Sequence, residues 1–329
     1  MTIVFHQITK KMGESNMERK IDVLTFGDLC VDLIVSGGDV VPEFGQKEKL
    51  VDNYSLEMGG SCSIFACQTA KLGLKTAVVG RVGTDSFGEL VCGTLEEAGV
   101  STALIKRDLT KKTGISIALN KIDDRAILTY SSTVDGVERE DVTDELLRSV
   151  KHLHIGSYFL MKKIQPHYPD IIRKLKKYGA TISLDTNWDP EENWDNGIWD
   201  IIPYVDIFFP NENEAIALTR ETTAEKAIEK LKRFIPIIAV KKGKDGAVAY
   251  FQDKIYYAAA LNVVKADAVG AGDSFDGGFV YGFLSGKSIE ECNRIGCICG
   301  SLNTRMHGGT RGQPDLSEVT KYILGGQLW

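Results

Sequence analysis

The sequence predicts an α/β domain in which a mostly parallel sheet is covered by helices on both faces. From Ile21 onward, short apolar runs typical of buried strands alternate with longer stretches in which apolar residues recur at helical spacing. Alternation of this kind is typical of βαβ units, whose crossover helices cover both faces of the sheet. The expected strands lie at 22–28, 76–80, 152–156, 181–185, 206–209 and 237–241, and the expected helices at 63–72, 86–98, 141–150, 167–178 and 223–234.

Three further segments predict a second, smaller sheet outside this alternation. Residues 30–36, 49–57 and 113–131 are β-like, and the last of them alternates apolar with smaller or polar residues on either side of a turn near Asp123-Asp124. One interpretation is a small antiparallel β lid, built from about 30–57 and 113–131, that stands off the main domain. The other is an edge extension of the main sheet, and the pattern alone does not separate the two.

Composition and charge exclude several classes of protein. The chain has 329 residues and a formal net charge of −6, whereas a nucleic-acid-binding protein needs a basic face. No apolar run approaches about 18 residues, so we expect no membrane span. The seven cysteines form no C-x-x-C pair, which favours reduced thiols in the cytoplasm over disulfides or a zinc site. We expect a polar N-terminal tail at 1–20 and a single domain at 21–329.

The strongest chemical signal is the segment 267–279, which reads DAVGAGDSFDGGF. Its Gly270-Ala271-Gly272 turn opens into an amphipathic stretch, and glycines allow successive backbone N–H groups to converge on one spot. At the N-terminus of a helix, such groups bind anions such as phosphate. Asp273 would repel a phosphate, so it is better explained as a general base that activates a hydroxyl attacking the phosphate. A tight turn followed by an ordinary acid at a helix start is the alternative.

This segment resembles the C-terminal signature of the ribokinase-like PfkB carbohydrate kinases, D-T-x-G-A-G-D-x-F, with Ala268 in place of the usual Thr. The resemblance implies a ribokinase-like α/β fold and assigns the role of catalytic base to Asp273. The amides that would hold the transferred phosphoryl group belong to Gly270, Ala271 and Gly272. Beside this anion site, the resemblance implies a site for a monovalent cation, formed by Asp267, Val269 and Gly308.

A second signature lies near the N-terminus, where the segment 58–66 leads through Lys71-Leu72-Gly73 to 79–88. It resembles the family's G-G-x-x-x-N, L-G and G-x-x-G-x-D-x-x-G block. The resemblance implies that Gly59-Gly60 lets the chain pass close to the sugar, where any Cβ would intrude. Upstream, Asp32 matches a family residue that hydrogen-bonds sugar hydroxyls, although a lone Asp at a strand end is usually only a turn residue.

Two further segments resemble the nucleotide side of the family's site. The segment PNENE at 210–214 resembles the N-x-x-E element, which implies ATP binding by Asn211 and water-mediated binding of Mg²⁺ by Glu214. A helix cap, with Asn211 as N-cap and Glu214 three residues on, explains the same spacing, and both interpretations can hold at once. The segment VKKGKDG at 240–246 resembles the family's nucleotide-edge turn, and the residues implied to contact ATP there are Lys241, Gly243 and Gly246.

The acceptor side departs from the ribokinases proper. Cys30, Ser61 and Ile64 occupy positions where ribokinases carry polar, ribose-binding side chains, and Ile64 also replaces an Asn common in the family. Losing several such groups should change the substrate, so ribose is disfavoured. Trp188 stands where sugar-acid kinases often carry Arg, which leaves a 2-keto-3-deoxygluconate kinase without its expected carboxylate clamp.

Together these features predict an ATP-dependent kinase that phosphorylates a hydroxyl, expected to be primary, of a sugar or a related polyol or nucleoside. ATP and Mg²⁺ are the implied cofactors, and a requirement for K⁺ stays open. We expect no nucleic-acid or membrane partner, and a homodimer formed through the lid is one expected assembly. The alternatives are a catalytically silent sugar- or nucleotide-sensing relative and an α/β oxidoreductase. The second is weakened because the chain contains no G-x-G-x-x-G motif.

Overall fold

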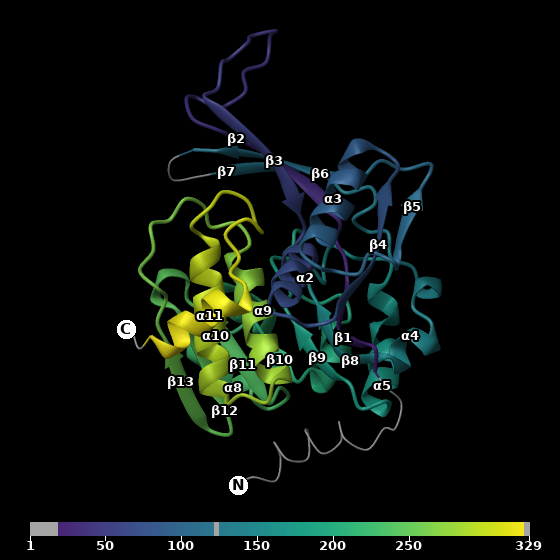
Figure 1. Cartoon of the computed structure of the whole chain (residues 1–329), viewed down its shortest axis with the longest axis vertical. Coiled ribbons are helices and arrows are strands. Elements are labelled where there is room, and N and C mark those ends of the chain that lie inside the picture. The colour runs from purple at the N-terminus through teal and green to yellow at the C-terminus, as the bar shows by residue number, and fades with distance from the viewer. Residues whose placement is uncertain (1–18, 122–124, 326–329) are drawn as a thin grey trace.

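The computed structural model describes residues 19–121 and 125–325, which form two separate β-sheets with helices around the larger one (Figure 1). The larger sheet runs in the order β13-β12-β11-β10-β9-β8-β1-β4-β5. Its strands are β1 (Ile21–Phe26), β4 (Thr76–Gly83), β5 (Ile105–Asp108), β8 (Val150–Ile155), β9 (Thr181–Leu184), β10 (Ile207–Phe208), β11 (Ile237–Lys241), β12 (Ala247–Phe251) and β13 (Lys254–Ala258). Neighbours from β5 to β11 pair in parallel, and β12 and β13 extend the sheet antiparallel.

Helices cover both faces of this sheet, which confirms the predicted fold class. They are α2 (Ser61–Lys71), α3 (Ser86–Glu97), α4 (Asp144–Arg148), α5 (Tyr168–Lys177), α6 (Ile198–Ile201), α7 (Glu212–Thr219), α8 (Ala224–Leu231), α9 (Ala271–Leu284), α10 (Ile289–Asn303) and α11 (Leu316–Leu324). One buried cluster packs α5 and α8 against one face of the sheet, and another packs α2 and α9 against the opposite face. The helix expected at 141–150 is shorter than predicted, because β8 begins at Val150.

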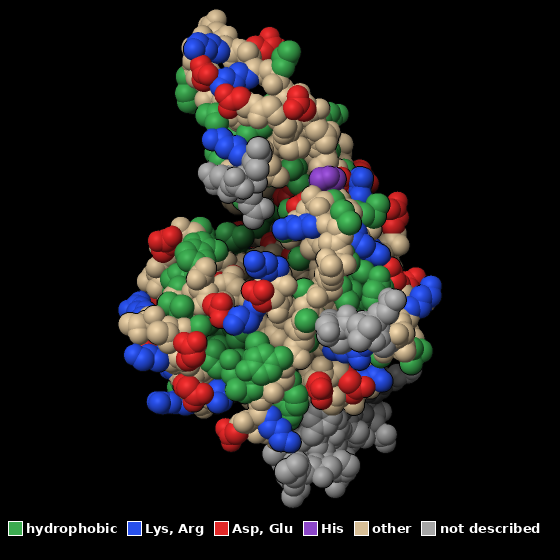
Figure 2. All heavy atoms as spheres, turned by 90° about the vertical axis from the view of Figure 1, so that its left-hand side faces the viewer, with side chains coloured by type: hydrophobic (Ala, Val, Ile, Leu, Met, Phe, Trp, Pro, Cys, Tyr) green, Lys and Arg blue, Asp and Glu red, His purple; other side chains and the backbone are tan. Residues whose placement is uncertain are grey.

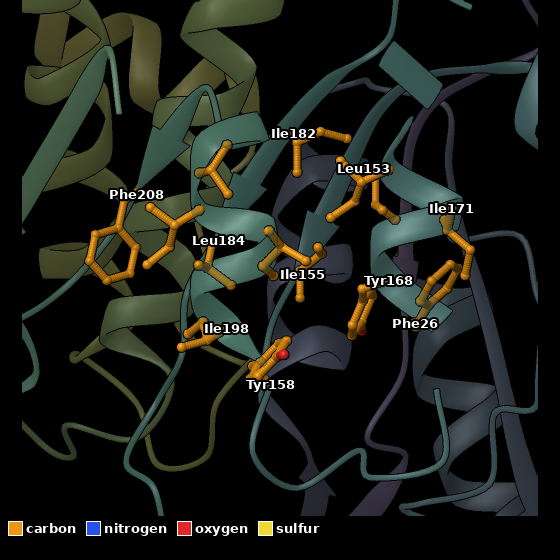
Figure 3. Packing of buried hydrophobic residues seen from close by; sticks show 14 of the residues in the cluster. Phe26, Leu153, Ile155, Tyr158, Tyr168, Ile171, Ile182, Leu184, Ile198 and Phe208 are labelled. Atoms are coloured by element: carbon orange, nitrogen blue, oxygen red, sulfur yellow. The ribbon is translucent and has the colours of Figure 1, made fainter. Parts of the chain in front are cut away.

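The larger core cluster forms because apolar residues alternate along the central strands. Leu153 and Ile155 of β8 and Ile182 of β9 are buried against Tyr168 and Ile171 of α5 (Figure 3). Each such side chain stabilises the fold by about 1.5–3 kcal/mol when it is removed from water. The packing fixes the carboxyl ends of the parallel strands relative to one another, and ligand sites of open α/β sheets lie at those ends.

The opposite face of β8 and β9 carries a buried polar row. His152 Nδ1 lies 2.7 Å from Thr181 Oγ1, and Ser183 Oγ lies 2.8 Å from both His152 Nε2 and His154 Nδ1. His154 also stacks on Phe65 of α2, with ring centroids 3.7 Å apart. Burial lowers the pKa of both histidines, that of His154 to about 3, so both rings are neutral at pH 7. Both are core residues, and each has a hydrogen-bond partner within this row.

The segments outside the strand–helix alternation form a sheet of their own, which we call the small sheet. Its order is β3-β2-β6-β7, with β2 (Cys30–Ser36), β3 (Asn53–Gly59), β6 (Gly114–Asn120) and β7 (Arg125–Tyr130). The two outer pairs are antiparallel, and the central pair β2–β6 is parallel. The small sheet projects from one end of the main domain, at the top of Figure 1. It is therefore not an edge extension of the main sheet.

Two sequence predictions fall on residues that the structure does not describe. The turn near Asp123-Asp124 lies outside the described residues, as do all but the last two positions of the expected tail at 1–20. In the described part of the chain, no helix is both long enough and apolar enough to cross a membrane.

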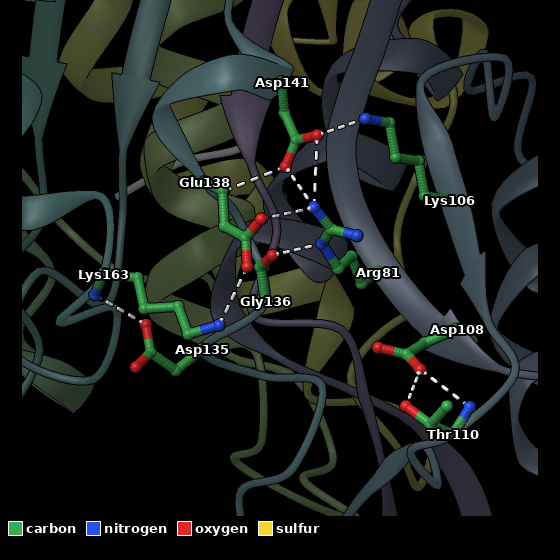
Figure 4. Close-up of polar contacts among 9 residues, drawn as sticks. All are labelled: Arg81, Lys106, Asp108, Thr110, Asp135, Gly136, Glu138, Asp141 and Lys163. Carbon is green, nitrogen blue, oxygen red and sulfur yellow. Dashed lines mark hydrogen bonds and ion pairs between the residues drawn. The ribbon is translucent and has the colours of Figure 1, made fainter.

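A network of ion pairs joins β4 and β5 to the segment that precedes α4 (Figure 4). Arg81 of β4 lies 3.0 Å from Asp141 and 3.1 Å from Glu138, and it also donates to the Gly136 carbonyl. Lys106 of β5 pairs with the same Asp141, whose side chain is only 5% exposed. Burial alone would raise the pKa of Asp141, but its hydrogen bonds and the two cations lower it. The Asp141 carboxylate therefore stays charged, and its charge depends on the ion pair with Arg81.

We predict that Arg81→Met lowers the free energy of unfolding by about 3 kcal/mol, because it leaves the buried Asp141 carboxylate with one partner fewer. Urea unfolding at pH 7 measures this loss. Arg107→Met is the matched control, since Arg107 pairs with Glu89, which is 70% exposed. That substitution should cost less than about 1 kcal/mol. Equal losses in the two variants would contradict the importance assigned to the Arg81 network.

Candidate active site

The predicted anion-binding turn lies at the N-terminus of α9. Gly270 is the N-cap and has a left-handed φ of 72°, and a Cβ there would lie 2.8 Å from Gly309 Cα, so both conformation and packing require glycine. The first helical hydrogen bond runs from the Ser274 N–H to the Gly270 carbonyl at 2.9 Å. The N–H groups of Gly272 and Asp273 therefore have no acceptor within the helix. With the helix dipole, they form a site suited to an anion.

Asp273 lies in the first turn of α9, beside this pair of amides. Its carboxylate is hydrogen-bonded to the side chain of Ser61, and Ser61 is the first residue of α2. Desolvation raises the pKa of Asp273 to about 8, the charge of Asp185 adds to this effect, and Lys241 opposes both. A carboxylate with such a pKa binds a proton more strongly than an ordinary aspartate does. This is a property expected of a general base that works near neutral pH.

Lys241 ends β11 and brings a positive charge close to the turn. Its Nζ lies 2.6 Å from Asp185 Oδ2 and 3.5 Å from Asp276 Oδ2. A Cβ at Gly272 would lie 3.4 Å from the same Nζ. Burial alone would lower the pKa of Lys241, but the surrounding carboxylates raise it, so the ammonium group keeps its charge. That charge is held within reach of an anion bound at the turn.

A cavity of about 570 Å³ adjoins the turn, a volume typical of small-ligand pockets. It brings together Ala271 and Gly272 of α9 with the three residues predicted along the nucleotide, Lys241, Gly243 and Gly246. The remaining lining residues include Lys244, Asn262, Lys265 and the apolar Leu261, Val263 and Phe275. Gly246 has a φ of 86°, and a Cβ there would lie 2.0 Å from the Ala258 carbonyl oxygen. Asn211 does not line the cavity, although it pairs with Lys241 in an isolated β-bridge.

Asn211 and Glu214 form the capping box of α7. The Asn211 side chain accepts from the Glu214 N–H, and Glu214 Oε2 accepts from the Asn211 N–H, both at 2.9 Å. The helix-cap interpretation is therefore confirmed. Glu214 is also buried, and desolvation together with the charge of Asp185 raises its pKa to about 6. The capping box thus fixes a buried carboxylate close to Asp185 and Lys241.

The three residues predicted for a monovalent cation do lie together. Asp267 Oδ1 accepts from the Val269 N–H at 3.1 Å, and Asp267 Oδ2 accepts from the Gly308 N–H at 3.2 Å. The Val269 carbonyl accepts from the Asn303 side chain at 2.8 Å. These contacts tie the start of the anion turn to the loop after α10. Asp267 Oδ1 also accepts from the Ala268 N–H at 2.6 Å, so a cation would have to use the lone pairs that these hydrogen bonds leave.

On the other side of Asp273, the paired glycines at the end of β3 make room for the Asp32 carboxylate and for the backbone of Asp28. A Cβ at Gly59 would lie 2.4 Å from Asp32 Oδ1, and a Cβ at Gly60 would lie 2.3 Å from the Asp28 carbonyl oxygen. Gly60 also has a φ of 88°, which favours glycine. The immediate reason for both glycines is therefore contact within the protein. Seen from the side, the surface is hollowed between the small sheet and the main domain (Figure 2).

Asp28 has a structural role that the sequence did not indicate. Its carboxylate accepts from the N–H groups of Ser61 and Cys62 at 3.0 Å, at the start of α2, and from the Ser157 hydroxyl at 2.6 Å. Asn187 completes the group, donating to the Ser61 hydroxyl and accepting from the Ser157 N–H, both at 3.0 Å. Burial raises the pKa of Asp28, while these hydrogen bonds lower it. Residues from three distant segments are thereby held beside Asp273.

Two buried aspartates in the site were not predicted as site residues. Asp185 follows β9, at the carboxyl end of a parallel strand, and Asp276 lies one helical turn after Asp273 on α9. Burial raises the pKa of Asp276 well above its usual range, whereas Lys241 lowers that of Asp185 in spite of its burial. A proton on Asp276 lets both carboxyl groups share one lysine. The i, i+3 spacing from Asp273 is the sequence signal that could have pointed to Asp276.

Within the described residues, no group of three or more His, Cys, Asp or Glu side chains has an arrangement that could hold a metal ion by itself. The cysteines in this part of the chain are all free and buried.

Known proteins resemble this chain over most of its length. The protein-family model that is described as pfkB family carbohydrate kinase matches residues 20–316 of this chain. A sugar kinase of Archaeoglobus fulgidus, described as uncharacterized, is 28% identical over 248 residues, which are 74% of this chain and 97% of the relative. A 5-dehydro-2-deoxygluconokinase of Geobacillus thermodenitrificans is 25% identical over 330 residues, covering 93% of this chain and 94% of the relative. The crystal structure of a probable sugar kinase of Rhizobium etli superposes with a TM-score of 0.81 at 26% identity, covering 93% of this chain and 99% of that one.

We predict that Asp273→Asn raises the melting temperature, and that the gain grows from about pH 5 to about pH 8. In the folded protein this carboxyl keeps its proton up to a pH of about 8, whereas in the unfolded chain it loses the proton near pH 4. Between these values the folded state binds more protons, so wild-type stability falls as the pH rises. Asn cannot ionise, so the stability of the variant does not fall with pH for this reason.

Scanning calorimetry of both proteins across this pH range tests the prediction. Glu140→Gln is the control, because Glu140 is an exposed acid outside the site. It should leave the pH dependence unchanged. A melting-temperature difference between Asp273→Asn and wild type that does not vary with pH would mean that Asp273 is already ionised at neutral pH.

Proposed function

The chain belongs to the pfkB family of carbohydrate kinases, and on that premise we propose that it transfers the terminal phosphoryl group of ATP to a hydroxyl, expected to be primary, of a sugar or related small molecule. The observation that carries the proposal is the position of Asp273. Asp273 follows Gly272, which lines the cavity, and its carboxylate is hydrogen-bonded to Ser61, where the chain passes from β3 into α2. A base placed there can reach a hydroxyl on one side and a phosphate on the other.

ATP would occupy the cavity lined by Gly243, Gly246 and Gly272, with its phosphates at the N-terminus of α9. The acceptor would lie on the opposite side of Asp273, near Asp32 and the paired glycines. Phosphoryl transfer requires the attacking and leaving oxygens to be roughly in line. Two subsites on either side of the anion turn meet that requirement.

Asp273 would take the proton of the attacking hydroxyl. Its pKa of about 8 makes the carboxylate a better base than an unperturbed aspartate, at the cost of a smaller ionised fraction at pH 7. The amides of Gly270, Ala271 and Gly272 would hold the phosphoryl group during transfer. Ala271 contributes less in this arrangement, because its N–H already turns back to the Ala268 carbonyl at 3.3 Å.

Lys241 would act on the phosphoryl group as a fixed positive charge. Its Nζ is held by Asp185 at 2.6 Å, so it costs no reorganisation when a phosphate arrives beside Gly272. Mg²⁺ bound with ATP supplies further positive charge to the phosphate oxygens. Glu214 fits a role in holding that ion through water, because the capping box uses only Oε2 of this buried carboxylate. The proposal of a monovalent cation at Asp267 rests on the grouping of its three residues alone.

The small sheet would serve as a lid over the acceptor. It carries Asp32 and projects from the main domain beside the hollow between them. A lid of this kind excludes water during transfer. The opposite face of the sheet exposes Tyr54 by 70%, Leu128 by 65% and Tyr130 by 54%, which supports the pairing of two copies of the chain through their small sheets.

We predict that Asp273→Asn lowers kcat by about 10²–10⁴, the usual contribution of a general base, while the dissociation constant of ATP stays nearly unchanged. An ADP-release assay with the best acceptor measures kcat, and calorimetry measures ATP binding. For the wild type, kcat/KM should fall on the acid side of about pH 8, because the free enzyme must lose the Asp273 proton. A loss of kcat below tenfold would remove Asp273 from the role of base.

We predict that Asp32→Ala raises the KM of the acceptor about 10–150-fold and hardly changes the KM of ATP. A charge-assisted hydrogen bond contributes roughly 1.5–3 kcal/mol, and about 1.4 kcal/mol corresponds to a factor of ten. Asp39→Ala, at an exposed position in the loop between β2 and β3, is the matched control and should change neither KM. An acceptor KM that Asp32→Ala leaves unaltered would place the acceptor elsewhere.

A further inference from the structure

A second carboxylate lies next to Asp32 on the same face of the small sheet. In the β2–β3 register, Glu57 is the direct partner of Asp32. Directly paired residues point to the same face, with Cβ atoms about 4.5–5.5 Å apart. Gly59, two residues after Glu57, shares this face, and its missing Cβ leaves room for the Asp32 carboxylate. Glu57 and Asp32 therefore present adjacent acids toward the same space.

Glu57 reaches from the small sheet to the loop that borders the anion turn. Its side chain is 12% exposed, and its Oε1 lies 2.9 Å from Arg311. A Cβ at Gly308 would lie 3.0 Å from Glu57 Cγ and 3.4 Å from Glu57 Oε2. The next residue, Gly309, packs on Gly270 of the turn. Glu57 thus packs between the small sheet and the loop that contacts the anion-binding turn.

Acidic side chains surround this acceptor end. Asp28, Asp32, Glu57 and Asp273 all lie around it, while Arg311 is 60% exposed and already paired with Glu57. The other cation close to the turn, Lys241, is engaged by Asp185. Burial raises the pKa of Glu57 above its usual value, and Arg311 and His307 only partly oppose that shift. An anionic group on the acceptor would meet Asp32 and Glu57, and the neighbouring Arg311 already pairs with Glu57.

We propose that Glu57 binds the acceptor together with Asp32, and that the acceptor is therefore an uncharged sugar or polyol without a carboxylate or phosphate group. This inference rests on the proposed kinase function and adds the charge class of its substrate. A carboxylate only accepts hydrogen bonds, which suits the vicinal hydroxyls of a neutral sugar. The same carboxylate repels an anion, and such a like-charge contact lowers affinity by about 100-fold.

The contrary arrangement is that Arg311 leaves Glu57 and binds an acidic acceptor. One relative is named as a gluconokinase, so its acceptor carries a carboxylate. In this chain, however, a departing Arg311 would leave the mostly buried Glu57 unpaired beside the incoming anion. That would bring two negative charges together in a partly desolvated site. The geometry therefore favours the neutral acceptor.

Matched pairs of acceptors test the charge class. The pairs are glucose and gluconate, ribose and ribonate, and fructose and fructose 6-phosphate. Binding is measured by calorimetry on the Asp273→Asn variant loaded with ATP and Mg²⁺, and turnover by ADP release from the wild type. We expect the tightest-binding compound to be neutral, and its acidic partner to bind about 100-fold more weakly.

Variants then test whether Glu57 binds the acceptor. Glu57→Gln should weaken binding of the preferred neutral acceptor about tenfold and reduce discrimination against its acidic partner by a similar factor. Glu48→Gln, the same chemical change at an exposed position of the β2–β3 loop, should alter neither value. A melting temperature for each variant separates lost binding from lost folding. If Glu57→Gln is less stable, the ratio of acidic to neutral affinity still reports on Glu57, because misfolding lowers both affinities alike.

The outcomes separate this inference from the function on which it rests. An acidic compound that binds as tightly as its neutral partner, or more tightly, overturns the inference even when ADP release is normal. The absence of binding by every neutral member overturns it as well. Preferential binding of a neutral compound without any ADP release supports the charge class and removes the proposed kinase activity. An unchanged ratio in Glu57→Gln removes Glu57 from the acceptor site.

Discussion

The charge of Lys241 is the constraint on which the site depends. Four acidic side chains gather near its ammonium group, and all four are at least partly removed from water. One cation cannot balance four carboxylates, so the protons distribute unevenly among them. Asp185, at 2.6 Å, keeps its charge, while the pKa values of Asp273, Asp276 and Glu214 are raised. Removing Lys241 would leave buried carboxyl groups without compensation, a change that usually costs several kcal/mol.

The site also depends on close approach between segments that are far apart in sequence. The loop at 308–309 packs against Gly270 and Glu57, and the 59–60 pair packs against Asp32 and Asp28. A Cβ at Gly59, Gly60, Gly270 or Gly309 would lie between 2.3 and 2.8 Å from a neighbouring atom. At Gly60 and Gly270 the neighbouring atom belongs to the backbone, and both residues have a positive φ, so these two positions require glycine. At Gly59 and Gly309 the neighbouring atoms belong to the Asp32 and Ile64 side chains, so a larger residue there would have to displace them.

Local patterns predicted the main sheet and the anion turn well, because both depend on short-range periodicity and on turn chemistry. The Gly-Ala-Gly turn needs glycine for its own backbone, and the buried strands need apolar residues at their own positions. Asp28 and Glu57 could not be found in this way, since each gains its role from a partner on a distant segment, Ser61 for Asp28 and Arg311 for Glu57. Glu57 in particular becomes visible only when the β2–β3 register places it opposite Asp32. The parallel pairing of β2 with β6 is likewise a tertiary feature.

The two ends of the site differ in the charge of their surroundings, and the N-terminus of α9 lies between them. Its N-terminal amides and Lys241 favour an anion on one side, while acidic side chains surround the other. Asp273 stands between them, and the charges of Asp185 and Asp28 add to desolvation in raising its proton affinity. The acidic surroundings that would repel an anionic acceptor would therefore also strengthen Asp273 in its proposed role as a base. A cation introduced there to bind an acidic acceptor would lower the pKa of Asp273 and make this residue a weaker base. The charge of the preferred acceptor and the strength of the base would therefore follow from one arrangement of charges.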